Sequence, residues 1–319
     1  MAGESMAMDK RPTTARRLRG ALAAAALGLP LLLSACSASQ SSTVSSALPE
    51  PSVLASSVPE ATATLPGGSA DQATQSQAQI YWIGRTGGNA YLFPEPRKTD
   101  KNSDPVTAAL TVMMGQKPTD PDYFTAWQPP HRVAASISGT STITVDVSSD
   151  AFSRNLDPSM AKRAIQQLVF TAASAALTSG MVDGGAEPDV VLLIDGRSDV
   201  KAFGSIALGQ SFHRETAYLS PVSITSPQEG TTAGAGPLTF SGMVLGSSLD
   251  VRWKVVRLDV QNGQPDVVSA MTTAHLESAG VGRFSATVKL TPGRYELSVS
   301  KDGAPGTPAV VDTKTITIR

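Results

Sequence analysis

The chain has 319 residues and a single cysteine, Cys36. Having only one cysteine limits how the folded part of the chain can be stabilised. A disulfide needs two cysteines, so no internal disulfide can form. The sequence is basic from Lys10 to Arg19 and apolar from Gly20 to Leu33. A basic segment followed by a short apolar one is typical of an export signal, and this apolar stretch is shorter than the roughly 20 residues that span a bilayer. We therefore expect an exported chain whose folded parts depend on packed apolar cores.

The residues around the cysteine indicate how it is used. Leu33, Ser34 and Ala35 precede Cys36 and resemble a lipobox, the signal at which bacterial lipoproteins are lipidated and cleaved. The resemblance implies that residues 1–35 are a signal peptide removed by a signal peptidase, and that Cys36 carries a diacylglyceryl lipid. The alternative is a free or buried thiol that follows an ordinary cleaved signal. Several acyl chains bind a membrane firmly where one binds marginally, so we expect a lipid anchor in the cell membrane, with the domains on its extracytoplasmic side.

Residues 36–79 are predicted to form a flexible tether between the lipid and the folded chain. They are rich in Ser, Ala, Thr, Gln and Pro and contain few large apolar side chains. Such a segment cannot bury enough surface to offset the entropy lost on ordering. The net charge of −1 gives no reason to expect a nucleic-acid partner.

Residues 80–217 combine short strand patterns with two helix patterns, and we expect them to form one α+β domain. Two Asp-Pro pairs mark helix starts, because aspartate caps a helix and proline suits its first position. The expected elements, in chain order, are a hairpin over 80–93 that ends at Pro94 and Pro96, a helix from Pro105, a hairpin over 131–147, a helix from Pro158 and a strand over 189–195. This βαββαβ order is ferredoxin-like, and it predicts two helices on one face of an antiparallel sheet.

The same residues resemble a known domain family. The segments that carry the resemblance are "IYWIG", "AYLFPEPR", "DPVTAALTVMMG", "VAASISGTSTITVDVSSDAF", "AIQQLVFTAASAAL" and "VVLLIDGR". In this order and spacing they are similar to the GerMN domain of the spore germination protein GerM family. The resemblance implies a role in the cell envelope, in sporulation or germination, or beside a membrane protein.

Residues 218–319 have no helical periodicity and are predicted to form an all-β sandwich. Strands are expected at 222–225, 238–245, 249–258, 267–275, 283–290, 294–300 and 310–318. Val251, Trp253 and Val255 should face inward, with Arg252 and Lys254 facing outward. The segments "VSITSPQEG", "GPLTFSGMV", "VRWKVV" and "TKTITIR" resemble the immunoglobulin-like Gmad2 domain, which often follows GerMN.

The sequence offers no recognisable catalytic set. His131, His213 and His275 are scattered, and no motif of a zinc site, a nucleophile elbow or a phosphate loop is present. Metal ligation is therefore not expected, although a cation shared among Asp146, Asp150, Asp157, Asp195 and Asp199 is an alternative to their use as caps and turns. No cofactor is expected beyond the lipid on Cys36.

Three aromatic residues in the loop 115–130 are the candidates for contact with a partner. Tyr123, Phe124 and Trp127 could form a ledge on the surface, or they could cover a sheet edge or the core. The lipid anchor, the tether and two domains without a recognisable catalytic set favour a non-enzymatic docking or accessory protein that holds another envelope or membrane protein near the bilayer. The alternative is an extracytoplasmic module that binds cell-wall glycan or a small molecule, and a peptidoglycan hydrolase is a third hypothesis.

Overall fold

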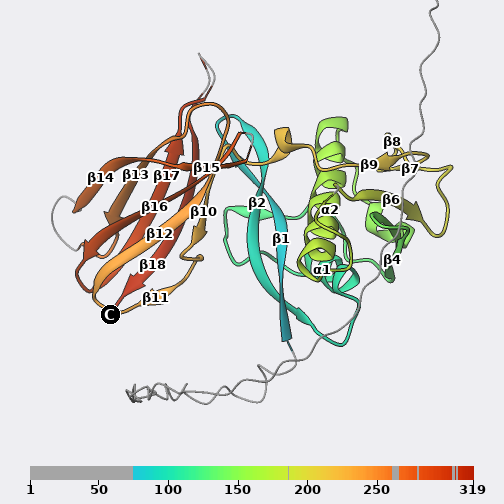
Figure 1. The fold of residues 1–319 in the computed structure, drawn as a ribbon, viewed down its shortest axis with the longest axis horizontal. Coiled ribbons are helices and arrows are strands. Elements are labelled where there is room, and N and C mark those ends of the chain that lie inside the picture. The colour runs from blue at the N-terminus through green and yellow to red at the C-terminus, as the bar shows by residue number, and fades with distance from the viewer. Residues whose placement is uncertain (1–74, 186, 261–265, 279, 304–305, 307) are drawn as a thin grey trace, which may run out of the picture. The chain divides into compact units, whose positions relative to one another are not determined.

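The structure is a computed structural model that describes residues 75–319, except residues 186, 261–265, 279, 304–305 and 307. The predicted signal, lipobox and lipid-bearing Cys36, and the tether as far as residue 74, lie outside the described residues. Within the described range the chain is mostly β-sheet, with two α-helices (Figure 1). Two clusters of buried apolar side chains are present, which we call the first core (residues 78–208) and the second core (residues 222–318).

The first sheet contains β1 (Gln75–Thr86), β2 (Asn89–Asp100) and β3 (Tyr123–Phe124), in the order β2-β1-β3. The strand β1 already begins at Gln75, before the expected start at residue 80, and β2 continues beyond Pro94 and Pro96. The prediction that these prolines end the strand is therefore wrong.

The edge position of β2 explains why it tolerates two prolines. Pro94 is opposite Tyr81, whose N–H donates to Thr171 instead of to β2. Because N–H and C=O of one strand residue point the same way, the nitrogen of Pro94 faces the free edge of the sheet, and so does that of Pro96 two residues later. A proline there removes no hydrogen bond from the ladder.

Both predicted helices are confirmed, with aspartate caps. The helix α1 (Pro105–Gly115) begins after Asp104, which accepts a 2.8 Å hydrogen bond from the N–H of Thr107. The helix α2 (Pro158–Thr178) begins after Asp157, which accepts from the N–H groups of the second and third helical residues.

The second sheet contains β4 (Val133–Ser138), β5 (Thr142–Val147), β6 (Asp189–Ile194) and β9 (Ser211–Phe212), in the order β4-β5-β6-β9. The short 3-10 helix Ser149–Phe152 lies between β5 and α2. Beyond β6, the strands β7 (Lys201–Ala202) and β8 (Ile206–Ala207) pair with each other, and the 3-10 helix Thr216–Tyr218 leads to the second core.

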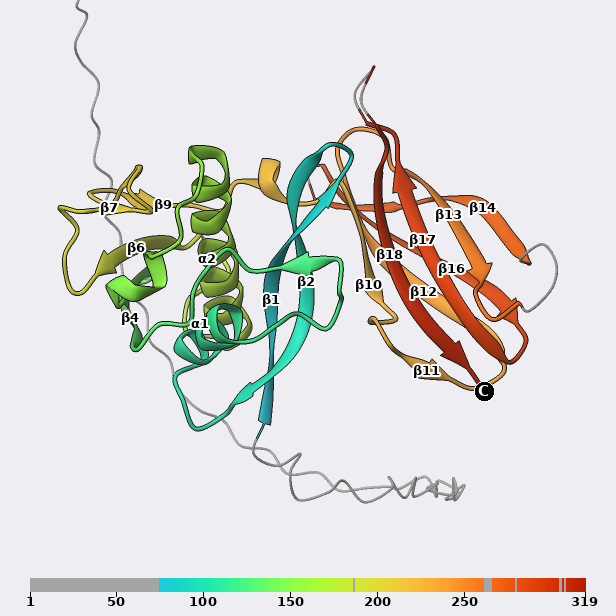
Figure 2. The same cartoon turned by 180° about the vertical axis from the view of Figure 1, so that it is seen from behind.

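The helices lie between these two sheets (Figures 1 and 2), and β5 pairs with β6 in parallel. The expected single antiparallel sheet with helices on one face is therefore wrong. The helix α2 is buried around its whole circumference from Ala164 to Ala176, and a helix that is buried all round needs cover on both sides. The crossover through α2 makes the pairing of β5 and β6 parallel.

Two further sheets surround the second core. One has the order β10-β12-β16-β15 and the other has the order β11-β18-β17-β13-β14. Their strands are β10 (Val222–Ser226), β11 (Thr232–Ala233), β12 (Gly236–Leu245), β13 (Asp250–Arg257), β14 (Val267–Thr273), β15 (His275–Ser278), β16 (Val281–Leu290), β17 (Gly293–Lys301) and β18 (Val310–Ile318).

All seven strands predicted for this region are confirmed, with the short β11 and β15 in addition. The expected alternation on β13 is also confirmed, since Trp253 is buried while Arg252 and Lys254 are exposed. The rings of Phe240 on one sheet and Trp253 on the other meet edge to face, 5.3 Å apart. Both sheets thus contribute to one core.

No α-helix among the described residues is both long enough and apolar enough to cross a membrane.

Candidate functional site

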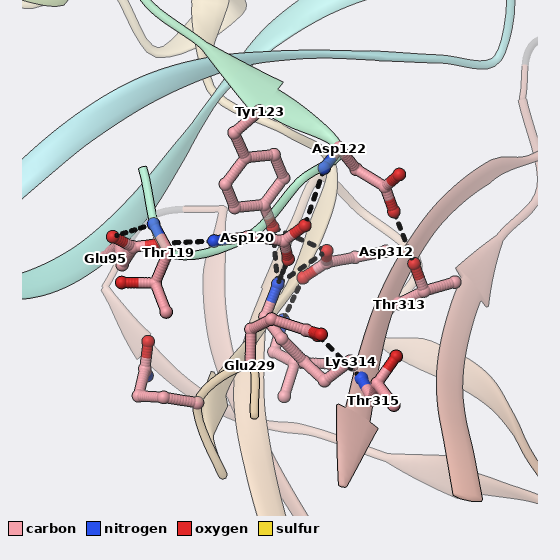
Figure 3. Close-up of polar contacts among 12 residues, drawn as sticks. Glu95, Thr119, Asp120, Asp122, Tyr123, Glu229, Asp312, Thr313, Lys314 and Thr315 are labelled. Atoms are coloured by element: carbon pink, nitrogen blue, oxygen red, sulfur yellow. Dashed lines mark hydrogen bonds and ion pairs between the residues drawn. The ribbon is translucent and has the colours of Figure 1, made fainter. Parts of the chain in front are cut away.

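A cluster of charged side chains lies buried between the first core and the second. Lys314 on β18 places its Nζ 2.6 Å from Oδ2 of Asp120, 3.2 Å from Oδ1 of Asp312 and 2.7 Å from the hydroxyl of Tyr123 (Figure 3). The side chains of Lys314, Asp120 and Asp312 are only 2–3% exposed. We call these four residues the Lys314 cluster.

Local structure fixes each member of the cluster. Asp312 and Lys314 are two residues apart on β18, so both point to its buried face. The loop before β3 supplies Asp120, and the carboxylate of Glu95 on β2 holds this loop. It accepts hydrogen bonds from the N–H groups of Thr119, at 3.0 Å, and Asp120, at 3.1 Å. The site is therefore built from β3, the loop before it and β18, with Glu95 of β2 holding the loop, and β18 is far from the other elements in sequence.

The electrostatics of the cluster favour a tightly held ion pair. Burial raises the pKa of Asp312. Burial lowers the pKa of Lys314, but Asp312 and Asp120 outweigh it, so the pKa of this lysine stands above its ordinary value. Burial, followed by the charge of Asp312, raises the pKa of Tyr123 well above its ordinary value. Removing one partner of such a buried pair typically costs about 3–5 kcal/mol, because the other charge is left uncompensated.

Other hydrogen bonds join the same two regions of the chain. Thr313 donates to Asp122 at 2.9 Å, while within the second core Oδ2 of Asp312 accepts from the N–H of Ile224 at 2.6 Å. The N–H of Val311 donates to Thr86 at 2.8 Å. The first half of β18 is thus fixed to elements of the first core.

The aromatic residues proposed for partner contact are mostly inside the molecule. Tyr123 belongs to the Lys314 cluster, and Trp127 is buried with its Nε1 donating to the carbonyl oxygen of Ala164 at 3.1 Å. Phe124 is half-buried, and Arg85 lies over its ring. Of the two interpretations of this loop, the one in which it covers a sheet edge and the core describes the observed positions of Tyr123 and Trp127.

The acidic residues considered for a shared cation have partners of their own. Oδ2 of Asp146 is 2.7 Å from an arginine, Arg132, and Asp150 pairs with His131 at the same distance. Asp157 caps α2, and Asp199 pairs with Arg197. Across the described residues, no group of three or more side chains has the arrangement that a metal ion needs.

Apart from Tyr123, which was proposed for contact with a partner, the residues of the Lys314 cluster were not predicted from the sequence, although one signal was available. In "VVDTKTITI" the period-two pattern places Asp312 and Lys314 on the same face as Val310, Ile316 and Ile318. Two opposite charges on the apolar face of a strand indicate a buried ion pair. The third partner, Asp120, has no such signal because it comes from an irregular loop.

A second feature is the outer edge of β14. This strand ends its sheet, contains neither a charged residue nor a proline, and leaves Val267, Val268 and Met271 exposed by 52%, 43% and 62%. A shallow hollow of about 480 Å³ lies beside it, on the outer face of β13, β14 and β17. Arg252, Lys254, Met271 and Val311 are among the residues that line the hollow.

The comparison with known protein families gives a match for the part of the chain that forms the first core. Residues 79–200 match the family model Germane, which is described as "Sporulation and spore germination". Residues 79–200 are therefore similar to the Germane domain. The match ends before β10, so the second core lies outside it. Among curated proteins the sequence has no significant match.

Solved structures show more distant similarity. The tandem GerMN domains of the sporulation protein GerM from Bacillus subtilis align with 16% identity and a TM-score of 0.35, over 47% of this chain and 49% of that one. This chain thus spans about half the length of that structure. An engineered protein aligns with 19% identity and a TM-score of 0.24, over 40% of this chain and 24% of its own. A chain from a structure that describes T cell specificity and activation by the bacterial superantigen toxic shock syndrome toxin-1 aligns with 11% identity and a TM-score of 0.21, over 31% of this chain and 99% of its own.

Proposed function

We propose that this protein is a lipid-anchored, non-enzymatic docking protein of the cell envelope, and that it binds an extended segment of another membrane or wall-associated protein along β14. The match of residues 79–200 to the Germane family supports a role in sporulation or germination. In this proposal the sheets of the second core form an immunoglobulin-like module of the Gmad2 type. The observation that carries the proposal is the outer edge of β14, with which no strand of the described chain pairs.

The hydrogen bonds beside β14 define which of its backbone groups are free for a partner. The N–H of Ala274 donates to Leu249, and Asp266 accepts from the N–H of Arg257. Because bonded positions alternate along an antiparallel pair, Val268, Ala270 and Thr272 direct their backbone groups toward β13. The backbone groups of Val267, Ser269, Met271 and Thr273 therefore point outward, away from the sheet.

The side chains at this edge indicate the chemistry of the segment that binds. Proteins usually protect edge strands with charges, prolines or short lengths, and β14 has none of these protections over its seven residues. A strand added there would be bound by main-chain hydrogen bonds, with apolar contacts to Val267, Val268 and Met271. We therefore expect an uncharged, partly apolar segment in extended conformation.

Other long edge strands in the described chain are protected. The strand β2 has prolines and charged residues along its free side. The strand β4 is uncharged like β14, but its edge is partly covered because the N–H of Ala135 donates to Thr107 on α1 at 3.1 Å. The contrast between β4 and β14 favours β14 as the docking edge.

Lipid anchoring would make a weak contact at this edge sufficient. A tether confines the domains near the membrane and so raises their effective concentration beside other membrane proteins. Changing Cys36→Ser should abolish palmitate labelling and release the protein from membranes. A Cys36→Ser protein that still incorporates palmitate and sediments with membranes would overturn the anchor.

The docking edge can be tested with a proline that leaves the fold intact. Ser269 directs its N–H outward, so Ser269→Pro should remove a docking hydrogen bond without removing one to β13. Ser269→Thr is the matched control, because it keeps the N–H and suits a strand. Both variants would be expressed in the native host with a photo-crosslinking residue at Thr273, which also directs its backbone outward.

We expect a specific crosslinked envelope protein with Ser269→Thr, and at least a tenfold loss of that product with Ser269→Pro. Equal crosslinking by both folded variants would overturn the docking edge. A product that contains only a second copy of this chain would show self-pairing, and would overturn the assignment of a different protein as the occupant. Turnover of a wall glycan by the purified protein would contradict the non-enzymatic role.

A further inference from the structure

We propose that Lys314 and Asp120 condense with each other into an intramolecular amide bond, which covalently joins β18 to the loop before β3. This modification is independent of the docking edge. It would act as a crosslink in a chain whose single cysteine excludes an internal disulfide.

The geometry places the reacting groups in contact. Nζ of Lys314 is 2.6 Å from Oδ2 of Asp120, and the carboxyl carbon lies one covalent bond beyond that oxygen. This is close to the separation of about 3–3.5 Å from which well-oriented groups react. Asp120 is held in place by the hydrogen bonds that Glu95 accepts from the loop and by its own acceptance of the Asp122 N–H at 2.9 Å.

Burial excludes the water that would otherwise compete. Both reacting side chains are 2–3% exposed, and the ring of Tyr123 lies 4.5 Å from Nζ. Effective molarities of about 10⁵–10⁸ M are reached when two groups are held in this way. Condensation also converts two desolvated charges into a neutral amide, which a dry site accommodates more easily.

A third group, the carboxylate of Asp312, can move the protons. Oδ1 of Asp312 is 3.2 Å from Nζ and accepts a hydrogen bond from Tyr123 at 2.6 Å. Asp312 takes one proton from the lysine ammonium, and the neutral amine then forms a bond to the carboxyl carbon of Asp120. Oδ2 of Asp120 leaves as water, carrying two protons that originate from the ammonium. The amide keeps the third proton, so the atoms balance and no oxidant or reductant is needed.

The amide has a clear signature after trypsin digestion. Trypsin cuts after lysine and arginine but not before proline, so Asp120 falls in the peptide 102–132. With Lys314 free, the end of the chain gives the peptides 302–314 and 315–319. With Lys314 acylated, trypsin does not cut after it, and peptide 302–319 stays joined to peptide 102–132. The joined product is lighter than the two peptides together by the mass of one water molecule.

The experiment is mass spectrometry of the full chain purified from its native host and digested in this way. We expect the joined peptide in the native protein and in Asp122→Asn, a neighbouring change that leaves the three reacting groups in place. We expect at least a tenfold loss of the joined peptide in Asp312→Asn. Free peptides 302–314 and 315–319 from the native protein, without the joined product, would overturn the proposal. An undiminished yield in Asp312→Asn would overturn the proton transfer through Asp312.

Discussion

The hydroxyl of Tyr123 donates a 2.6 Å hydrogen bond to Oδ1 of Asp312, although 189 positions separate the two residues in the sequence. Tyr123 also belongs to β3, which extends the first sheet, and its ring stacks on Phe93 with the centroids 4.8 Å apart. One side chain therefore packs in the first core and holds a charged residue of β18. This connection predicts that changes at the Lys314 cluster affect the stability of both cores.

Replacing Tyr123 with phenylalanine should lower the free energy of unfolding by about 1–3 kcal/mol, since a buried carboxylate loses a hydrogen bond. The measurement is urea unfolding of the full chain, followed by circular dichroism. Tyr91→Phe is the control, because the Tyr91 hydroxyl forms no hydrogen bond to another described residue and its change should have little effect. Equal effects of the two substitutions would contradict the role of the hydroxyl.

The free energy of unfolding should fall in alkaline solution because of Tyr123. Burial and the neighbouring carboxylates of Asp312, Asp120 and Glu95 raise the pKa of Tyr123 well above the ordinary value of 10.0. In the unfolded chain Tyr123 ionises near that value, whereas in the folded protein it stays protonated to higher pH. Its contribution to the free energy of unfolding is therefore complete below pH 10.0 and is lost as the pH rises above it. Unfolding measured from pH 8 to pH 11 should show a steeper decline for the native chain than for Tyr123→Phe. Parallel curves would contradict this assignment.

Much of the secondary structure was predictable because it depends on local signals. The Asp-Pro pairs at 104–105 and 157–158 marked both helix starts, since a cap and its helix are neighbours in sequence. The alternation around Trp253 identified β13 in the same way. The pairing of β5 with β6 and the division of strands between two sheets depend on packing around α2, which no local pattern describes.

The candidate sites could likewise be predicted only as far as they depend on local sequence patterns. The Lys314 cluster combines two residues that an alternating strand places on one face with Asp120, whose position depends on hydrogen bonds to Glu95. Tyr123 and Trp127 were both expected in a loop, but Tyr123 lies on β3, and the burial of both side chains depends on residues that lie elsewhere in the sequence. Local patterns thus identified residue types but not their long-range partners.

Truncating the tryptophan of the second core should destabilise that core strongly. Trp253 is buried and contacts Phe240 across the two sheets, and truncation of a buried tryptophan costs about 3–5 kcal/mol. We expect Trp253→Ala to lower the thermal unfolding midpoint measured by calorimetry. Lys254→Ala, on the exposed face of the same strand, should change it little. A native midpoint for Trp253→Ala would show that the packing of Trp253 contributes nothing to stability.

One glycine in the second core should tolerate no side chain. A Cβ on Gly242 of β12 would clash with the carbonyl oxygen of Ser223 and the ring of Phe284. Overpacking of this kind costs about 1–3 kcal/mol or more, so Gly242→Ala should lower the denaturation midpoint in urea. Gly234→Ala is the control, because its Cβ would meet no atom within 4 Å. Equal midpoints for the two variants would contradict this assignment.

The shortness of β11 has a consequence for how the protein could assemble. The five-stranded sheet ends in the seven-residue β14 on one side and in the two-residue β11 on the other. Strand addition propagates into a fibre only when each new subunit offers a second edge to the next. This sheet has one long edge strand and one edge strand of only two residues. Binding at β14 would therefore end after one step, and the complex would contain a fixed number of chains instead of growing into a polymer.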